Sequence, residues 1–116
     1  MVSALGQIAD PRAVLPLLEC LGRTHDGLYG LPLVKSLAEF SDPRIRPVVV
    51  KWLSDLLIRC VDTRNNLWGC AAAKELGQML EKTAVKALSV AAYQGTKPIR
   101  ESAELALRWI RKGKVN

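Results

Sequence analysis

A four-residue pattern recurs along the chain at intervals that fit pairs of short helices. Leu5-Gly6-Gln7-Ile8 is matched by Leu37-Ala38-Glu39-Phe40 after 32 residues, by Leu76-Gly77-Gln78-Met79 after a further 39, and by Leu107-Arg108-Trp109-Ile110 after a further 31. A repeat of this length, with apolar residues at helical spacing, is typical of stacked helical pairs. The pattern therefore predicts an all-α fold: an α-α superhelix, wound as a right-handed solenoid of about three helical-pair repeats.

The junctions between repeats carry an Asp-Pro pair, in Asp10-Pro11-Arg12 and again in Asp42-Pro43-Arg44. An aspartate can cap a helix by accepting hydrogen bonds from its free N–H groups, and proline suits the first helical position. The residue before a proline avoids helical backbone, so the preceding helix must end there. Each pair is thus expected to end one helix and begin the next. The third junction has no proline, and Thr83 is its expected cap.

These signals together define the expected order of elements. Residues 2–9 form the end of one helix, and further helices are expected at 11–22, 30–41, 43–60, 65–81, 83–94 and 97–112. Pro16, Pro32 and Pro47 fall near first turns, and Pro16 and Pro47 are expected to tilt or kink their helices.

We interpret residues 1–116 as a single domain that begins inside the second helix of a truncated first repeat. A helix end that exposes the apolar residues Val2, Leu5 and Ile8 would favour association with another surface. Homodimerisation through the N-terminal end is therefore a hypothesis.

Composition favours a globular protein in a reducing compartment. The chain has 116 residues, of which 49% are hydrophobic, which suits one domain with a core of its own. Its apolar runs are shorter than the ~20 residues of a membrane span, and the first residues lack the features of a signal peptide. We expect a cytoplasmic location and no membrane partner. Cys20, Cys60 and Cys70 form no CxxC motif and are expected to be buried free thiols.

The sequence offers little to a catalytic, metal or cofactor site. The single histidine, His25, lies in a turn-like stretch beside Asp26, where a solvated side chain is the expected role. No phosphate-binding loop, dinucleotide fingerprint or nucleophile elbow is present. We predict no catalytic residue, no metal and no cofactor. Trp52 and Trp68 are expected to pack in the core.

Two stretches resemble a known family of helical repeats. IRESAELALRWI (99–110) resembles the second helix of the HEAT-like repeats found in bilin lyases and bacterial scaffold proteins, and ALGQIADPRAVLPLL (4–18) resembles the junction to the next repeat. The resemblance implies that second helices line a concave surface. It implies no lyase activity, because no catalytic motif is matched. Trp52 and Asp55 resemble the groove residues of HEAT-like alkylpurine DNA glycosylases only superficially, so an enzyme ranks third among the functions considered.

Charge provides the remaining functional signal. The net charge is +6, and residues 95–116 hold six basic residues against two acidic ones. Such an end could attract an acidic protein or nucleic acid phosphates, or it could only complement a helix dipole and keep the terminal repeat soluble. The favoured function is a non-catalytic scaffold or adaptor that binds a protein; the alternative is nucleic-acid binding through the basic C-terminal third. The candidate partner-binding residues are Arg64, Lys74, Arg100, Arg108, Arg111 and Lys112.

Overall fold

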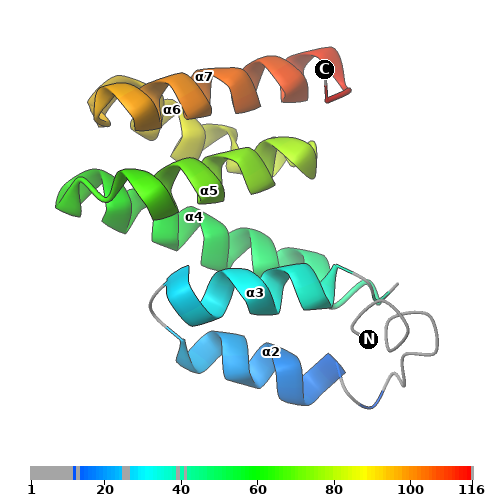
Figure 1. The fold of residues 1–116 in the computed structure, drawn as a ribbon. Coiled ribbons are helices and arrows are strands. Elements are labelled where there is room, and N and C mark those ends of the chain that lie inside the picture. The colour runs from blue at the N-terminus through cyan, green and yellow to red at the C-terminus, as the bar shows by residue number, and fades with distance from the viewer. Residues whose placement is uncertain (1–11, 13, 25–26, 39, 41, 116) are drawn as a thin grey trace. The chain divides into compact units, whose positions relative to one another are not determined.

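A computed structural model describes residues 12, 14–24, 27–38, 40 and 42–115 (Figure 1). Six α-helices and one short 3-10 turn make up its regular structure, and no strand occurs in this part of the chain. The elements are α2 (Val14–Arg23), α3 (Gly27–Leu37), α4 (Ile45–Thr63), α5 (Asn66–Gln78), η2 (Lys82–Ala84), α6 (Val85–Gln94) and α7 (Lys97–Lys112). The all-α prediction is confirmed. His25, residues 2–9 and the first Asp-Pro pair lie outside the described residues.

The chain divides into two compact units, residues 1–52 and 53–116, and α4 is continuous across the division. The first unit holds α2, α3 and the beginning of α4. Trp52 of α4 contacts both other helices of this unit. Its indole Nε1 donates a hydrogen bond to the carbonyl oxygen of Thr24, directly after α2, over 2.8 Å. Its ring lies so close to α3 that a Cβ at Gly30 would fall 2.0 Å from Trp52 Cζ2. The expectation that Trp52 packs between helices is confirmed.

The second unit holds the rest of α4 with α5, η2, α6 and α7, and small residues set its packing. A Cβ at Gly77 would lie 2.7 Å from Ala106 Cα, and one at Gly69 would lie 2.8 Å from Ile99 Cδ1. The backbones of α5 and α7 can approach this closely only because glycine has no side chain there. The buried apolar residues of this unit are Leu53, Leu56, Leu57, Cys60, Val61, Ala72, Ala73, Leu76, Ala84, Leu88, Ala91, Ile99, Ala103, Ala106, Trp109 and Ile110.

Local backbone chemistry explains where the helices begin and end. The predicted α7 boundaries are confirmed: the helix ends at Gly113, whose φ of 79° is left-handed. The other boundaries shift by up to about four residues. Helix α4 runs on to Thr63 and ends where Arg64 takes a φ of 57°, and α5 ends before Leu80, which has a φ of 52°. Left-handed backbone stops a helix, and in these non-glycine residues nothing in the sequence indicated it.

Two predictions about helix starts have different outcomes. The Asp42 carboxylate accepts a hydrogen bond from the Arg44 backbone N–H over 2.8 Å, as predicted for this side chain, but in the turn before α4, which begins only at Ile45. The prediction for Thr83 is wrong: this exposed residue lies inside η2, and neither η2 nor α6 has a side-chain cap. Because α3 begins three residues early, Pro32 is its sixth residue and lies beyond the first turn, so the Leu28 carbonyl receives no amide from it.

The expected burial of the cysteines and tryptophans is only partly right. Cys60 is buried, and burial raises the pKa of its thiol. Cys20 is exposed and Cys70 is half-buried, so the expectation of three buried thiols is wrong. Trp68 is also half-buried, where a core residue was expected. Apolar spacing in the sequence predicts which residues share one face of a helix. How far that face is buried depends on the elements that pack against it.

Candidate functional site

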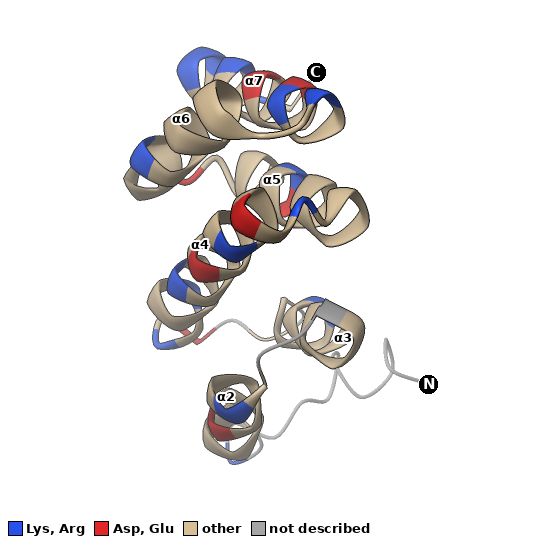
Figure 2. Ribbon diagram, turned by 90° about the vertical axis from the view of Figure 1, so that its left-hand side faces the viewer, with Lys and Arg blue, Asp and Glu red and all other residues tan. Residues whose placement is uncertain are grey.

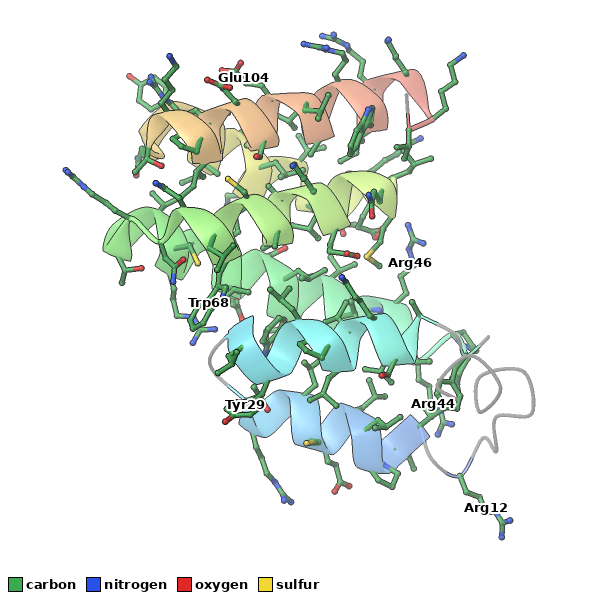
Figure 3. All side chains as sticks on the ribbon, viewed as in Figure 1. Arg12, Tyr29, Arg44, Arg46, Trp68 and Glu104 are labelled. Atoms are coloured by element: carbon green, nitrogen blue, oxygen red, sulfur yellow. The ribbon has the colours of Figure 1, made fainter. Side chains whose placement is uncertain are left out.

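Helix α7 separates its apolar and charged residues completely. One side, packed in the second unit, buries Ile99, Ser102, Ala103, Ala106, Trp109 and Ile110. The opposite side carries the exposed residues Lys97, Arg100, Glu101, Glu104, Arg108, Arg111 and Lys112, which we call the charged face of α7. Figure 2 shows basic and acidic positions along this helix, and in Figure 3 Glu104 extends away from α5. The charged face therefore looks outward from the α5–α7 contact.

The repeat register shows how unusual this face is. A shift of 31 residues relates Leu76 to Leu107, and the same shift relates Gly69, Ala73 and Gly77 of α5 to Arg100, Glu104 and Arg108 of α7. On α5, the two glycines of this row pack closely against α7. The equivalent row on α7 is long, charged and exposed. A polar outer face of this kind is typical of the terminal repeat of a helical array.

The cations of the charged face are available to a ligand. Within the part of the chain that the structure describes, Arg100, Arg108, Arg111 and Lys112 make no ion pair within 4.0 Å. Arg111 and Lys112 lie in the last turn, where a positive charge complements the helix dipole. Lys114 follows directly and is also exposed. This end of α7 thus concentrates positive charge with no carboxylate between Arg108 and Lys114.

The structure brings four of the six sequence-predicted site residues together. Arg100, Arg108, Arg111 and Lys112 share the charged face, which also carries Glu104. Lys74 is exposed on α5, the helix against which α7 packs with its other side, and Arg64 forms the turn between α4 and α5. These two residues are exposed but lie on elements other than the charged face.

Sequence reasoning missed two polar features of the second unit. Asn65 caps α5, since its side-chain Oδ1 accepts a hydrogen bond from the Trp68 backbone N–H over 3.1 Å. Beside it, the Thr96 hydroxyl donates to Asn66 Oδ1 and so ties the α6–α7 turn to the start of α5. The Asn-Asn pair before an apolar run was a usable signal for a cap. No sequence signal predicts the contact with Thr96.

Other kinds of site find little support in the described part of the chain. No group of three histidine, cysteine or carboxylate side chains is placed to hold a metal ion there. Trp109, the one aromatic residue of α7, is only 9% exposed, and its ring cannot stack on a base. None of the described helices combines the length and the apolar character needed to cross a bilayer.

The fold and this face define an all-α protein of packed helices, in which α7 carries an exposed charged face. Residues 1–23 match the family model of the PBS lyase HEAT-like repeat. The match confirms the resemblance to HEAT-like repeats that the sequence carries, in a segment that precedes and includes α2. This repeat is a structural unit of a kind that often mediates protein interactions. No significant match was found among curated proteins or solved structures.

Proposed function

We propose that the chain is a non-catalytic scaffold or adaptor that binds an acidic segment of a protein partner on the charged face of α7. The observation that carries this proposal is the row Arg100, Arg108, Arg111 and Lys112, exposed and without ion pairs among the described residues. Unpaired cations held on a rigid helix favour an anionic partner. The HEAT-like repeat at residues 1–23 favours a protein as that partner.

Nucleic-acid binding is the second candidate, because the same cations could contact phosphates. Burial of Trp109 counts against recognition of single strands by base stacking. Backbone electrostatics would then supply the affinity and make it strongly dependent on salt. A protein that neutralises three phosphates should lose about 40-fold in affinity between about 50 and 200 mM salt.

A direct comparison of probes separates the two candidates. Fluorescence anisotropy would follow labelled 15-residue peptides rich in aspartate and glutamate, and labelled single- and double-stranded oligonucleotides, at both salt concentrations. The test variant carries Arg108→Glu, Arg111→Glu and Lys112→Glu. The control carries Arg59→Glu, Lys82→Glu and Lys86→Glu, which change the net charge equally at exposed positions outside α7.

We expect the native chain to bind the acidic peptides more tightly than the oligonucleotides. Only the test variant should lose affinity for the peptides. If the native chain binds oligonucleotides more tightly than peptides and the test variant no longer binds them, nucleic-acid binding replaces protein binding as the function of this face. Equal losses in both variants would show that net charge, and not this face, attracts the probes. If nothing binds at the lower salt, the charged face is only a solubilising surface.

A further inference from the structure

Within the charged face of α7, acidic and basic residues occupy two separate halves. Glu101 and Glu104 lie in the N-terminal half of the helix, and Arg108 and Arg111 lie in the C-terminal half. We call these four residues the seam of α7. All four side chains are exposed, and Figure 3 shows Glu104 extending from the outer side of the helix.

The spacing of the seam is that of a contact line between two helices. Its members follow one another after three, four and three residues, which keeps them on one side of α7. The same alternation of three and four residues forms the line along which two long helices pack side by side. In the part of the chain that the structure describes, no element covers the seam. The seam therefore has the spacing to meet another helix of similar length.

The charges of the seam are also without partners. Among the described residues, none of the four lies within 4.0 Å of an opposite charge. This includes Glu104 and Arg108, although they are one helical turn apart. A helix that presents the reverse order of charges could pair all four at once.

A second copy of α7 that runs in the opposite direction presents this reverse order. With a two-fold axis through the middle of the seam, Glu101 faces Arg111 of the partner subunit, and Glu104 faces Arg108 of the partner subunit. The symmetry repeats both contacts, so every charge of the two seams is matched.

Other arrangements of two α7 helices set like charges against each other. A parallel copy places each residue of the seam opposite itself. Sliding the antiparallel copy by one heptad in either direction brings glutamate to glutamate or arginine to arginine. Like charges in direct opposition are unfavourable, so the seam specifies one orientation and one register.

Apolar residues border the seam close to the same axis. Leu105 and Leu107 lie on its two sides and are half-buried. In the antiparallel pair, each leucine lies near the same leucine of the other copy, which adds apolar contact beside the ion pairs. Arg100 approaches the basic C-terminal turn of the other copy, but at an exposed edge, where solvent screens the repulsion.

We infer that the charged face of α7 is a self-association surface, on which a second copy of this chain docks with its α7 antiparallel. The dimer is reversible, because exposed ion pairs each contribute little. The inference does not depend on the function proposed for this face. An acidic segment would contact only the basic half of the seam, so it would compete with the second copy for Arg108 and Arg111.

Sedimentation velocity over a range of protein concentrations tests the inference by exchanging charges. The basic variant carries Glu101→Arg and Glu104→Arg, and the acidic variant carries Arg108→Glu and Arg111→Glu. The exchanged variant combines all four substitutions and keeps the native net charge. The matched control for the acidic variant is Arg59→Glu with Lys86→Glu, which changes the net charge equally at exposed positions outside α7.

The salt concentration separates contact pairs from general repulsion. At about 100 mM salt, charges of the two chains that lie more than about 10 Å apart are screened, whereas ion pairs in contact persist. The native chain should then form dimers, and the basic and acidic variants should each associate at least about tenfold more weakly. The exchanged variant and the control should dimerise as the native chain does.

An equimolar mixture of the basic and acidic variants gives the decisive measurement. It should dimerise at least as tightly as the native chain, because each subunit supplies one sign to every ion pair. A mixture that stays monomeric would overturn the inference, and so would variants that each dimerise as tightly as the native chain. Preferential pairing of the native chain with the exchanged variant would indicate a parallel arrangement and would overturn the antiparallel one.

A native chain that is monomeric at every concentration would also overturn the inference. Binding of acidic peptides is measured separately by anisotropy. A monomeric chain that binds these peptides would therefore retain the proposed function and lose only the self-association.

Discussion

Two buried tryptophans differ in one hydrogen bond, and this difference can be measured. Trp52 Nε1 donates to the Thr24 carbonyl, whereas Trp109 Nε1 is buried with no partner found. Trp52→Phe removes a satisfied donor and leaves a carbonyl unpaired, while Trp109→Phe removes a donor that was already unsatisfied. A lost partner of this kind costs about 1–3 kcal/mol. We expect Trp52→Phe to destabilise the chain by at least about 1 kcal/mol more than Trp109→Phe.

Urea unfolding followed by circular dichroism measures both free energies. Each variant replaces an indole by a phenyl ring, so the loss of packing is similar in the two, and the comparison isolates the hydrogen bond. Equal losses would mean that the Trp109 indole has a partner or that the bond from Trp52 contributes nothing.

Asp42 is the residue whose charge should report most directly on local structure. Hydrogen bonds from the Arg44 guanidinium and backbone N–H lower the pKa of the Asp42 carboxyl from 3.8 to about 2. Because the folded chain favours the carboxylate, this contact stabilises the chain above pH 4 and ceases to do so as pH falls toward 2. A carboxyl-selective NMR titration should give a midpoint near pH 2 for Asp42.

Arg44→Ala should move that midpoint upward, toward 3.8, because the backbone hydrogen bond alone remains. Arg59→Ala removes an exposed arginine elsewhere and should leave it unchanged. A midpoint near 3.8 in the native chain would show that the contact does not persist in solution.

At the scale of single elements, the positions of the helices were predicted more accurately from the sequence than the residues that cap them. The apolar spacing located every described α-helix, but capping depends on backbone angles that composition does not fix. Thr83 was the expected cap and makes no capping hydrogen bond, while Asn65 was overlooked and caps α5. We expect Asn65→Ala to cost about 1 kcal/mol.

Thr83→Ala is the matched control for Asn65→Ala. It removes an exposed hydroxyl from η2 and should change stability by less than about 0.5 kcal/mol. Thermal melts of both variants make the comparison, and Asn65→Asp should retain most of the cap. A larger loss from Thr83→Ala than from Asn65→Ala would contradict the capping found in the structure.

Glycines inside helices offer a second comparison at this scale. A Cβ at Gly30 would overlap the Trp52 ring, whereas one at Gly22 would meet open space. Gly30→Ala should destabilise the chain by about 1–3 kcal/mol through overpacking. Gly22→Ala should stabilise it by up to about 1 kcal/mol, because alanine is the better helix former. Chemical denaturation distinguishes the two, and a neutral Gly30→Ala would mean that Trp52 moves aside at little cost.

For the whole molecule, the recurring Leu-Gly-Gln-Ile pattern was enough to predict packed helical pairs. Helical spacing also predicted that Arg108 and Arg111 lie on the same side of the last helix, whereas the grouping of Arg100 and Lys112 with them is seen only in the structure. It could not predict the exposure of Cys20 or Tyr29. Cys20 matches Ala91 at a shift of 71 residues and Tyr29 matches Ile99 at a shift of 70, and Ala91 and Ile99 are fully buried. Burial at these positions therefore depends on the neighbouring elements and not on helical spacing alone.

The two units should differ in their resistance to local opening. The second unit buries a continuous set of residues from α4 to α7, while α2 and α3 leave Leu15, Leu28 and Tyr29 exposed. Segments with few buried apolar contacts open at lower free energy. Native-state hydrogen exchange should therefore show slower exchange in α5 and α7 than in α2 and α3. Uniform protection would mean that the chain opens as one cooperative unit.

The row Arg100, Glu104 and Arg108 determines how closely another helix can pack against α7. The equivalent row on α5, with glycine at both ends, lets α7 pack closely against it, whereas this row carries long, charged, exposed side chains. The substitutions Arg100→Gly, Glu104→Ala and Arg108→Gly would give α7 the same row of small residues that α5 has at Gly69, Ala73 and Gly77. Another helix could then pack closely against α7 at this row. We expect such a variant to self-associate through this face by close packing, because small residues would replace the charged side chains that keep another helix at a distance.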